Sequence, residues 1–288
     1  MTRPLTGSQM LLAATKTLSD AGVPDAARDA RKLFAYASGV EAWRLTLTLP
    51  EPVTDEVRDR FYLLISRRAA REPVSHLIGT REFYGRSFEV TADVLDPRPE
   101  TETLIDAALR NNFARVLDLG TGSGCILVTL LAEMPHAIGV GGDVSAAALA
   151  VAERNARRHG VDDRATFVQS DWMASIPQPF DLIVSNPPYI AADEMADLSP
   201  EVRGFEPRMA LTDEGDGLSA YRAIIAQAIP ALMPGASLLL EIGPTQGHAV
   251  GQLMRDADLR NVTVIPDLDG RDRVVAGQMV GFDAATRR

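Results

Sequence analysis

The first 75 residues carry the hydrophobic spacing of short amphipathic helices. The pattern predicts helices near residues 7–20, over Asp25–Ser38 and over 55–72. In the last of these, apolar side chains recur at the spacing of one helix face: Val57, Phe61, Leu64 and Ile65. We therefore expect a small helical domain over residues 1–75.

The pattern changes after this region. The segment REFYGRSFEV at 81–90 places aromatic and aliphatic residues on both sides of Gly85, as in two short strands joined by a turn. We expect a β-hairpin connector over residues 76–94.

From Pro99 onward, strand and helix patterns alternate. Buried strands are expected at 115–119, 137–142, 164–169, 180–185, 236–242, 261–265 and 273–279. Helices are expected at 99–110, 124–133, 146–159, 218–232 and 245–257. This alternation predicts an α/β fold over residues 95–288, a doubly wound, mainly parallel, seven-stranded Rossmann-like sheet. Such sheets bind their ligands at the carboxyl ends of the strands.

Composition narrows the class of protein. The 288 residues are 46% hydrophobic and 24% charged, as in ordinary globular proteins, and no apolar run approaches the roughly 18 residues that a membrane span needs. The start of the chain lacks the features of a secretory signal, so a cytoplasmic location is expected. The single cysteine, Cys125, and the four scattered histidines do not have metal-ligand spacing, so no metal is expected.

The net charge of −10 is unevenly distributed. Residues 1–75 have 11 basic and 9 acidic side chains, whereas residues 76–288 have 18 and 30. A strongly acidic body repels the phosphate backbone, so direct nucleic-acid binding is not expected. The charge favours a protein or small-molecule partner.

A glycine-rich loop follows the first strand of the predicted sheet. Gly120, Thr121, Gly122, Ser123 and Gly124 lead directly into a helix that begins at Cys125. Glycines allow positive φ angles and a close backbone approach, and the helix N-terminus offers free N–H groups to a carboxylate. A dinucleotide-binding G-x-G-x-x-G loop would need glycine at Cys125, and a phosphate-binding P-loop is also absent. The loop therefore favours a small ligand without phosphates.

Acidic and aromatic residues follow the next two strands. Asp143 lies about 20 residues after the loop, where a carboxylate accepts bonds from ribose hydroxyls. Asp171 and Trp172 end the third strand and offer an acceptor for an exocyclic amine beside a face that stacks on adenine. Taken one at a time, the glycine loop fits a tight turn, Asp143 fits a helix-end carboxylate and Trp172 fits a core aromatic, each about as well as a ligand contact. At three successive strand ends they predict an adenosine pocket.

The fourth strand ends in a stiff tetrapeptide, Asn186, Pro187, Pro188 and Tyr189. The two prolines fix φ and lack N–H groups, so the bend presents carbonyl oxygens. A planar –NH2 group could donate one hydrogen to the side-chain oxygen of Asn186 and the other to the carbonyl of Pro187. Both bonds help localise the nitrogen lone pair, and Tyr189 can stack on the flat group. The tetrapeptide is the candidate catalytic and substrate-binding element.

Taken together, these motifs resemble the class I S-adenosylmethionine methyltransferases, and within them the release factor glutamine methyltransferases. The resemblance extends over nearly the whole chain. It is carried by Phe83, Pro97–Glu102, Asp118–Gly124, Asp143, Asp171-Trp172, Asn186–Tyr189, Glu206-Pro207 and Asp269–Arg273.

The resemblance implies methyl transfer from S-adenosylmethionine to the glutamine side-chain amide in the Gly-Gly-Gln loop of class I peptide chain release factors. Gly120–Gly124, Asp143, Trp172 and Asn186 would contact the cofactor, and Asn186–Tyr189 would contact the glutamine. The alternative is methylation of an exocyclic amine of adenine or guanine in a nucleic acid, since related enzymes use similar tetrapeptides. A non-enzymatic adenosine-binding module would not need this tetrapeptide.

The sequence leaves open the roles of Arg98 and Glu100, the effect of two departures from the family pattern, and the surface that recognises the substrate protein. Arg98 and Glu100 fit an ion pair or a cap of the following helix as well as a substrate contact. The pair Gly141-Gly142 and the residue Asp96 stand where the family usually has bulkier and apolar residues. The helical domain is the available surface for recognising a whole release factor, because one glutamine side chain is too small to identify it.

Overall fold

The computed structural model describes residues 5–176 and 179–281 and divides into two compact units. One unit contains the chain up to Thr80 together with Ser199–Phe205, and the other contains Arg81–Leu198 and the chain from Glu206 onward. The terminal residues of the expected domains lie outside the described part. The limits 1–75, 76–94 and 95–288 stay predictions.

The first unit is helical. Its helices are α1 (Gly7–Asp20), α2 (Ala26–Ser38), α3 (Leu45–Thr48), α4 (Asp55–Ala69), α5 (Val74–Ile78) and α9 (Pro200–Phe205). The side chains of Thr6 and Thr54 accept hydrogen bonds from backbone N–H groups at the starts of α1 and α4, as N-caps do. The core is apolar, and within it the rings of Phe34 and Phe61 pack edge to face with their centroids 5.1 Å apart.

An ionic network centred on the buried Arg68 lies in the helical unit. The Arg68 guanidinium donates to Asp29 at 2.8 Å and to Glu201 of α9 at 3.0 Å, and Arg71 donates to the other Glu201 oxygen at 2.7 Å. Burial alone would raise the pKa of Glu201, but the bonds from Arg71 and Arg68 outweigh it and hold the pKa below its usual value. The network thus joins a distant segment of the chain to the N-terminal helices.

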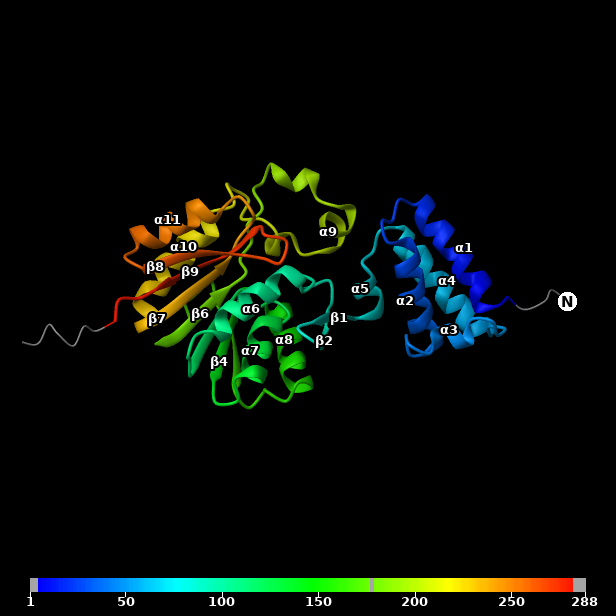
Figure 1. The fold of residues 1–288 in the computed structure, drawn as a ribbon, viewed down its shortest axis with the longest axis horizontal. Helices are drawn as coiled ribbons and strands as arrows, with labels where there is room; N and C mark the ends of the chain where they lie inside the picture. Colours follow the sequence, from blue (N-terminus) through cyan, green and yellow to red (C-terminus); the bar gives the residue numbers. More distant parts are fainter. Residues whose placement is uncertain (1–4, 177–178, 282–288) are drawn as a thin grey trace, which may run out of the picture. The chain divides into compact units, whose positions relative to one another are not determined.

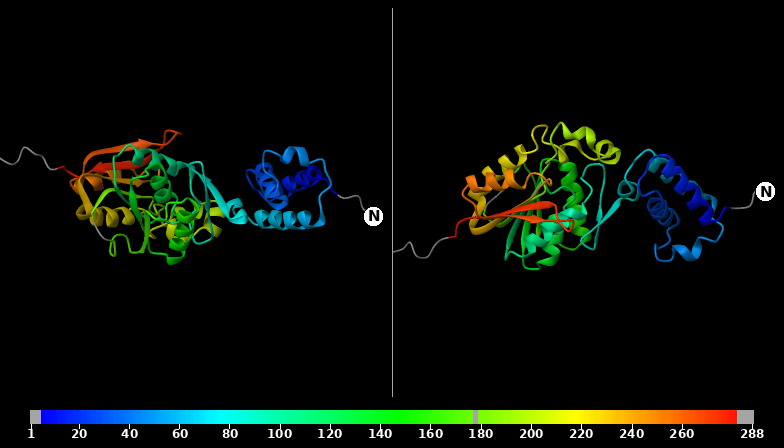
Figure 2. Two further views of the ribbon diagram at one scale, coloured as in Figure 1. Left: turned by 90° about the horizontal axis from the view of Figure 1, so that it is seen from below. Right: turned by 45° about the horizontal axis from the view of Figure 1, so that its top comes forward.

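The second unit is a seven-stranded sheet with helices on both faces (Figures 1 and 2). Its strands are β3 (Arg115–Leu119), β4 (Ile138–Asp143), β5 (Ala165–Gln169), β6 (Phe180–Ser185), β7 (Leu232–Glu241), β8 (Arg260–Pro266) and β9 (Asp272–Gln278), in the order β5-β4-β3-β6-β7-β9-β8. The first five run parallel, and β9 is antiparallel to both β7 and β8. The order reverses between β3 and β6, which is where a doubly wound sheet binds its ligand.

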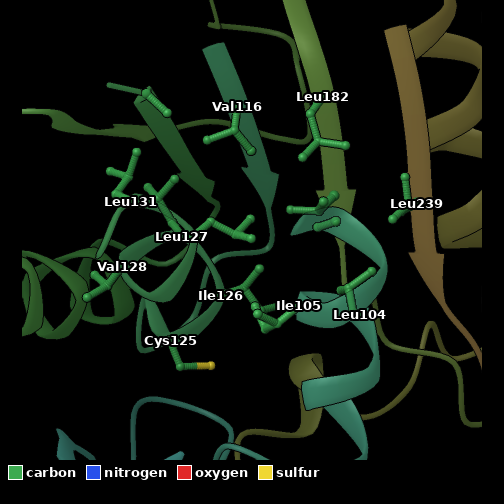
Figure 3. Close-up of a cluster of buried hydrophobic side chains, with 14 of the residues drawn as sticks. Leu104, Ile105, Val116, Cys125, Ile126, Leu127, Val128, Leu131, Leu182 and Leu239 are labelled. Carbon is green, nitrogen blue, oxygen red and sulfur yellow. The ribbon is translucent and has the colours of Figure 1, made fainter. Parts of the chain in front are cut away.

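Side chains alternate between the two faces of the sheet. Val116 and Leu182 face the helices α6 (Glu102–Leu109) and α7 (Cys125–Glu133), whereas Leu117 and Ile183 face the side of α10 (Ser219–Ala228) and α11 (Gly247–Asp256). Figure 3 shows the first of these clusters, in which Leu104, Ile105, Ile126 and Leu127 meet the strands. Helix α8 (Ala146–Arg158) adds Ala156 to it.

The predicted hairpin is formed by β1 (Thr80–Phe83) and β2 (Arg86–Glu89). Phe83 and Phe88 are buried with α6 and α7, with ring centroids 6.0 Å apart. The backbone N–H of Tyr84 donates to the Glu102 carboxylate at 2.8 Å. The hairpin is therefore part of the core that supports the sheet.

The long periodic elements were predicted within a few residues, but short ones were missed. The missed helices are α3, α5 and α9, and the missed 3-10 turns are η2 (Glu194–Asp197) and η3 (Arg208–Ala210). The predicted helices at 99–110 and 218–232 each include a 3-10 turn, η1 (Pro99–Thr101) and η4 (Ile229–Ala231) respectively. Strand β7 begins at Leu232, four residues before the predicted start at 236. Helical elements of three to six residues are too short to show a helical hydrophobic period.

Candidate active site

The glycine loop connects β3 to α7, and three of its residues have a left-handed backbone conformation. Gly120, Gly122 and Gly124 have φ angles of 67°, 54° and 78°. The N–H groups of Gly120 and Thr121 both donate to the carbonyl of Gly142, at 2.8 and 3.0 Å. The loop is thereby held to the end of β4, and the first turn of α7 begins directly behind it.

Asp143 connects the loop to the following helix. One carboxylate oxygen accepts the N–H of Gly122 and the other accepts the N–H of Ser145, each at 2.9 Å. The side chain of Ser145 in turn accepts the N–H of Ala148 and caps the N-terminus of α8. Each carboxylate oxygen can accept a further bond, so Asp143 can hold two neighbouring hydroxyl groups of a ligand.

Asp171 and Trp172 follow β5. Trp172 has a φ of 49°, and its indole packs against the apolar face that includes Leu119 and Met173. The backbone N–H of Met173 donates to the Gln227 side chain at 3.0 Å, which fixes the turn. Asp171 is exposed at the same turn.

A single pocket brings most of the predicted residues together. Its wall includes Gly120, Thr121, Gly122, Ser123, Asp143, Asp171, Trp172, Asn186 and Pro188, together with Thr101, Cys125 and Met209. Gly124, Pro187 and Tyr189 are not on this wall. A Cβ on Gly124 would lie 3.0 Å from the Ala152 Cβ, so this glycine permits close packing of α7 on α8. The cofactor contact assigned to Gly124 stays a prediction.

The tetrapeptide begins where β6 ends. The Ser185 hydroxyl donates to the Leu119 carbonyl at 2.6 Å and so fixes the end of β6 against β3. The side-chain nitrogen of Asn186 donates to the Thr101 hydroxyl at 3.2 Å. Because both amide hydrogens lie on that nitrogen, the Asn186 oxygen is free of this bond and remains an acceptor.

The backbone of Tyr189 is hydrogen-bonded to the side chain of Gln246. The Gln246 side-chain nitrogen donates to the Tyr189 carbonyl at 2.9 Å and to the Gly217 carbonyl at 3.1 Å. Its oxygen accepts from the Gly243 N–H and from the Tyr221 hydroxyl, at 3.0 and 3.2 Å. Burial, with a contribution from Glu241, raises the pKa of the Tyr189 phenol to about 12, so this hydroxyl is neutral at ordinary pH.

Of the roles that the sequence left open for Arg98, the structure shows an ion pair. Its partner is Glu206, which is distant in the sequence. The Arg98 Nη2 lies 2.7 and 2.6 Å from the two oxygens of Glu206, which is buried. Burial raises the pKa of Glu206 to about 7, although Arg98 opposes the shift. Arg98 lines the pocket, and so does Pro207, which follows Glu206 in the sequence. The Arg98–Glu206 ion pair therefore holds the segment after the tetrapeptide to the pocket wall.

The unusual residues around β4 fit their surroundings. A Cβ on Gly141 would lie 2.8 Å from the Phe167 ring, and one on Gly142 would lie 2.6 Å from Ile176. Larger neighbouring side chains therefore occupy the space that bulkier residues would take. Asp96 is buried and lies 3.7 Å from the Arg81 guanidinium.

Sequence reasoning missed several residues that hold the candidate site. Thr101 and Glu206 lie in runs that carried the family resemblance, but nothing in their spacing showed that they contact Asn186 and Arg98. Gln246 and Glu241 gave no signal, because a single polar residue after a buried strand has many possible roles. Only the fold reveals that the Gln246 side chain bonds to the Tyr189 and Gly217 carbonyls and that Glu241 is buried.

The described residues show neither a metal site nor a membrane-spanning helix. Across residues 5–176 and 179–281, no three His, Cys, Asp or Glu side chains gather closely enough to hold a metal ion. Within the same ranges, no helix has the length and apolar character to cross a membrane.

The parallel sheet, its reversal point and the pocket at the strand ends define a Rossmann-like methyltransferase. A methyltransferase small domain matches residues 92–200, and a PrmC N-terminal domain matches residues 9–79. Two solved structures share the fold. A methyltransferase from Pyrococcus furiosus has a TM-score of 0.54 and 16% identity, over 75% of this chain and 99% of its own. The hMettl16 catalytic domain in complex with an RNA hairpin has a TM-score of 0.57 and 18% identity, over 77% and 83%.

Relatives of much higher identity specify the family. A release factor glutamine methyltransferase of Cereibacter sphaeroides is 57% identical, over 93% of this chain and 97% of its own. Enzymes with the same name from Rhodospirillum rubrum and Agrobacterium fabrum are 44% and 41% identical, over 89% and 94% of this chain and 80% and 96% of theirs. The chain belongs to the release factor glutamine methyltransferase family.

Proposed function

We propose that the protein transfers a methyl group from S-adenosylmethionine to the side-chain amide nitrogen of the glutamine in the Gly-Gly-Gln loop of class I peptide chain release factors. The observation that carries the proposal is the 57% identity, along 93% of the chain, to a protein named release factor glutamine methyltransferase. The position of Asn186 on the pocket wall agrees with it. The acidic balance of residues 76–288 weighs against a nucleic-acid substrate. A cytoplasmic location stays a prediction.

The residues of the pocket suit S-adenosylmethionine. Asp143 has carboxylate lone pairs left for the ribose hydroxyls, and Trp172 offers an aromatic face for the adenine. The glycine loop and the first turn of α7 offer backbone groups to the amino-acid end. When bound, S-adenosylmethionine supplies an electrophilic methyl group on a cationic sulfur.

The tetrapeptide suits the acceptor amide. The Asn186 oxygen accepts one hydrogen of the glutamine –NH2 group and the Pro187 carbonyl accepts the other, so the nitrogen lone pair faces the methyl carbon. As the new N–C bond forms, the C–S bond breaks and its electron pair stays on sulfur. The methylated nitrogen is then acidic and loses its extra proton, so a dedicated base is not required. Proximity and alignment supply most of the rate enhancement.

The test is methylation with labelled S-adenosylmethionine and three acceptors: a class I release factor, the same factor with its Gly-Gly-Gln glutamine replaced by alanine, and ribosomal RNA. We expect label only in the unaltered release factor. The Asn186→Ala variant should lose about 100-fold in kcat, the scale of a lost positioning contact, while still binding S-adenosylmethionine. Label in the RNA, or in the alanine-substituted factor, would reject the proposal.

A further inference from the structure

The side chain of Asn155, in helix α8, joins the hairpin of β1 and β2 to the glycine loop. Its oxygen accepts the backbone N–H of Glu89, the last residue of β2, at 2.7 Å. Its nitrogen donates to the Glu89 carbonyl at 3.0 Å and to the Ser123 carbonyl of the loop at 2.8 Å. Asn155 is 0% exposed and all three residues belong to the second unit, so the contact lies inside that unit.

One face of α8 makes this contact with the loop. Ala152 and Asn155 are three positions apart in the helix, so they lie on the same side of it. A Cβ on Gly124 would lie 3.0 Å from the Ala152 Cβ, and Asn155 holds the carbonyl of the preceding residue, Ser123. The two α8 residues thus fit the loop together, because the small one allows its backbone to come close and the polar one bonds to it.

The backbone groups around Asn155 fix the orientation of its amide. Glu89 presents both an N–H and a carbonyl to it, and Ser123 presents a carbonyl. The side-chain oxygen therefore faces the N–H, and each of the two amide hydrogens goes to one carbonyl. A flipped amide would place its oxygen against both carbonyls. Because Asn155 is buried, the unmatched groups would lack water as an alternative partner, so the observed orientation is strongly favoured.

The bond from Asn155 completes the fixing of one peptide group of the glycine loop. The Ser123 carbonyl accepts from Asn155, and the N–H of Gly124, in the same peptide group, donates to the Thr121 carbonyl at 2.8 Å. The glycines on either side of Ser123, Gly122 and Gly124, would otherwise allow this peptide group to rotate at little steric cost. Thr121, Gly122 and Ser123 line the pocket whereas Asn155 does not, so the carbonyl oxygen is directed away from the ligand.

The direction of this carbonyl matters for the ligand. In the proposed function, the glycine loop and the first turn of α7 bind the amino-acid end of S-adenosylmethionine. A carbonyl oxygen carries a partial negative charge, so an oxygen turned into the pocket at Ser123 would repel the carboxylate of that end. The bond to Asn155 removes this repulsion by holding the oxygen on the other side of the loop.

We propose that Asn155 is a positioning residue for the glycine loop, which holds the Ser123 carbonyl away from the pocket and ties the loop to β2. Asn155 lies outside the pocket wall, so it acts on the ligand through the backbone of Ser123. The inference rests on the proposed function for the identity of the ligand, S-adenosylmethionine. The link between the loop and β2 can be measured without any ligand.

The binding test uses full-length protein with two changes at Asn155. Asn155→Ala removes all three bonds, whereas Asn155→Asp keeps the size and the acceptor oxygen but, when ionised, lacks both donors. The matched control is His159→Phe at the end of α8. The His159 Nε2 lies 3.1 Å from the Ser87 carbonyl oxygen, and its ring packs on Phe88 with the centroids 4.8 Å apart. Phenylalanine keeps the ring but not the bond, so this variant loosens the hairpin without changing the contact with the glycine loop.

We expect both Asn155 variants to raise the dissociation constant for S-adenosylmethionine about 10-fold, the scale of one lost hydrogen bond. His159→Phe should stay within about 2-fold of the unaltered protein. At saturating S-adenosylmethionine, kcat on the release factor should change by less than about 3-fold, because Asn155 bonds to Glu89 and Ser123 and not to the tetrapeptide. Titration calorimetry that shows an unchanged dissociation constant in a folded Asn155 variant, or an equal rise in His159→Phe, would overturn the inference.

Hydrogen exchange of the backbone tests the link without ligand. Asn155→Ala should speed the exchange of the Glu89 N–H, whose bond it removes, and of the glycine loop, whereas His159→Phe should speed exchange in the hairpin alone. If Asn155→Ala does not fold, Asn155→Asp keeps the side-chain volume and gives the same comparison for the loop. Loop exchange in the folded variant that equals that of the unaltered protein would contradict the link.

A measurement on the unaltered protein needs no variant. Saturation with S-adenosylmethionine should slow the exchange of the Glu89 N–H, although Glu89 is not on the pocket wall. Unchanged exchange at Glu89 would show that the loop and β2 move independently and would reject the inference. A protein that gives the expected exchange in the variants but does not bind S-adenosylmethionine would reject only the proposed cofactor.

Discussion

The side chain of Gln246 donates a hydrogen bond of 2.9 Å to the carbonyl oxygen of Tyr189, the last residue of the candidate catalytic tetrapeptide. The same nitrogen donates to Gly217, where an added Cβ would lie 2.5 Å from the Tyr189 oxygen. Two separate segments therefore fix the path of the chain as it leaves the tetrapeptide. The backbone after Tyr189 is thus held by Gln246 and Gly217, which lie outside the tetrapeptide.

Gln246→Glu should weaken this support, because glutamate keeps the acceptor oxygen but lacks the two donors. The Tyr189 and Gly217 carbonyls would face a carboxylate, so we expect a loss of stability of about 1–3 kcal/mol and a fall in kcat of about 10-fold. The control is Gln252→Glu in α11, the helix that follows Gln246, because the exposed Gln252 side chain hydrogen-bonds to Asp256 and not to the tetrapeptide. Equal effects in the two variants would show that only the added charge matters. The measurements are thermal unfolding and single-turnover methylation.

Asp143→Ala should weaken S-adenosylmethionine binding by about 1–3 kcal/mol, the range for losing bonds to a charged acceptor. Part of this loss is indirect, because Asp143 also holds the N–H groups of Gly122 and Ser145. Titration calorimetry gives the affinity, and unfolding without ligand gives the cost to the loop. An unchanged affinity in a folded Asp143→Ala protein would remove this residue from the cofactor site.

Gly124→Ala should destabilise the catalytic unit more than Gly160→Ala does. Both glycines have positive φ angles, 78° and 65°, so alanine incurs a backbone cost of about 1–2 kcal/mol at either position. Only at Gly124 would the new Cβ also meet Ala152 at 3.0 Å, whereas nothing lies within 4 Å at Gly160. We expect an extra loss of about 1–3 kcal/mol from this overpacking. Similar unfolding midpoints in denaturant would contradict the close packing of α7 on α8.

The pH dependence of stability should reflect Asp118, which is buried below the glycine loop. Burial raises its pKa from 3.8 to about 7, although the Thr121 hydroxyl, at 2.6 Å, opposes the shift. Because the folded pKa is the higher one, the contribution of Asp118 is fully present below its unfolded pKa and is lost as the pH rises through about 7. Its share of the slope is at most about 1.4 kcal/mol per pH unit.

Asp118→Asn removes the titrating group and should flatten the fall in unfolding free energy between about pH 4 and pH 7. Asp162→Asn, on the exposed surface, is the matched control and should leave the slope unchanged. Denaturant unfolding at several pH values measures both. An Asp118→Asn protein with the full slope would assign the pH dependence to other buried carboxyl groups such as Glu206 and Glu241.

The sheet and the pocket could be predicted because their signals are local. The strand before Gly120 is apolar, the glycines follow it directly, and Asp143 ends the next strand, so topology alone places them at one edge of the sheet. The same reasoning brought Asn186 to that edge. These residues owe their position to strand ends, which the hydrophobic pattern locates well.

The supporting contacts could not be predicted, because they join residues far apart in the chain. Gln246 meets Tyr189 across 57 positions, and Arg98 meets Glu206 across 108. No period or spacing relates such pairs, and short turns such as η3 give no pattern in the sequence. The exit of the tetrapeptide and the wall formed by Pro207 were therefore visible only in the fold.

The ionic network of Arg68, Arg71 and Glu201 affects how chimaeras of this family must be made. Because α9 completes the helical unit, that unit is encoded by two separate stretches, one up to Thr80 and one at Ser199–Phe205. An exchange of only the first stretch between two family members would pair foreign arginines with the host's α9. A transplant of both stretches keeps the charges of this network matched. The helical unit is thus a discontinuous module of the chain, and its second part lies between Tyr189 and α10 in the sequence.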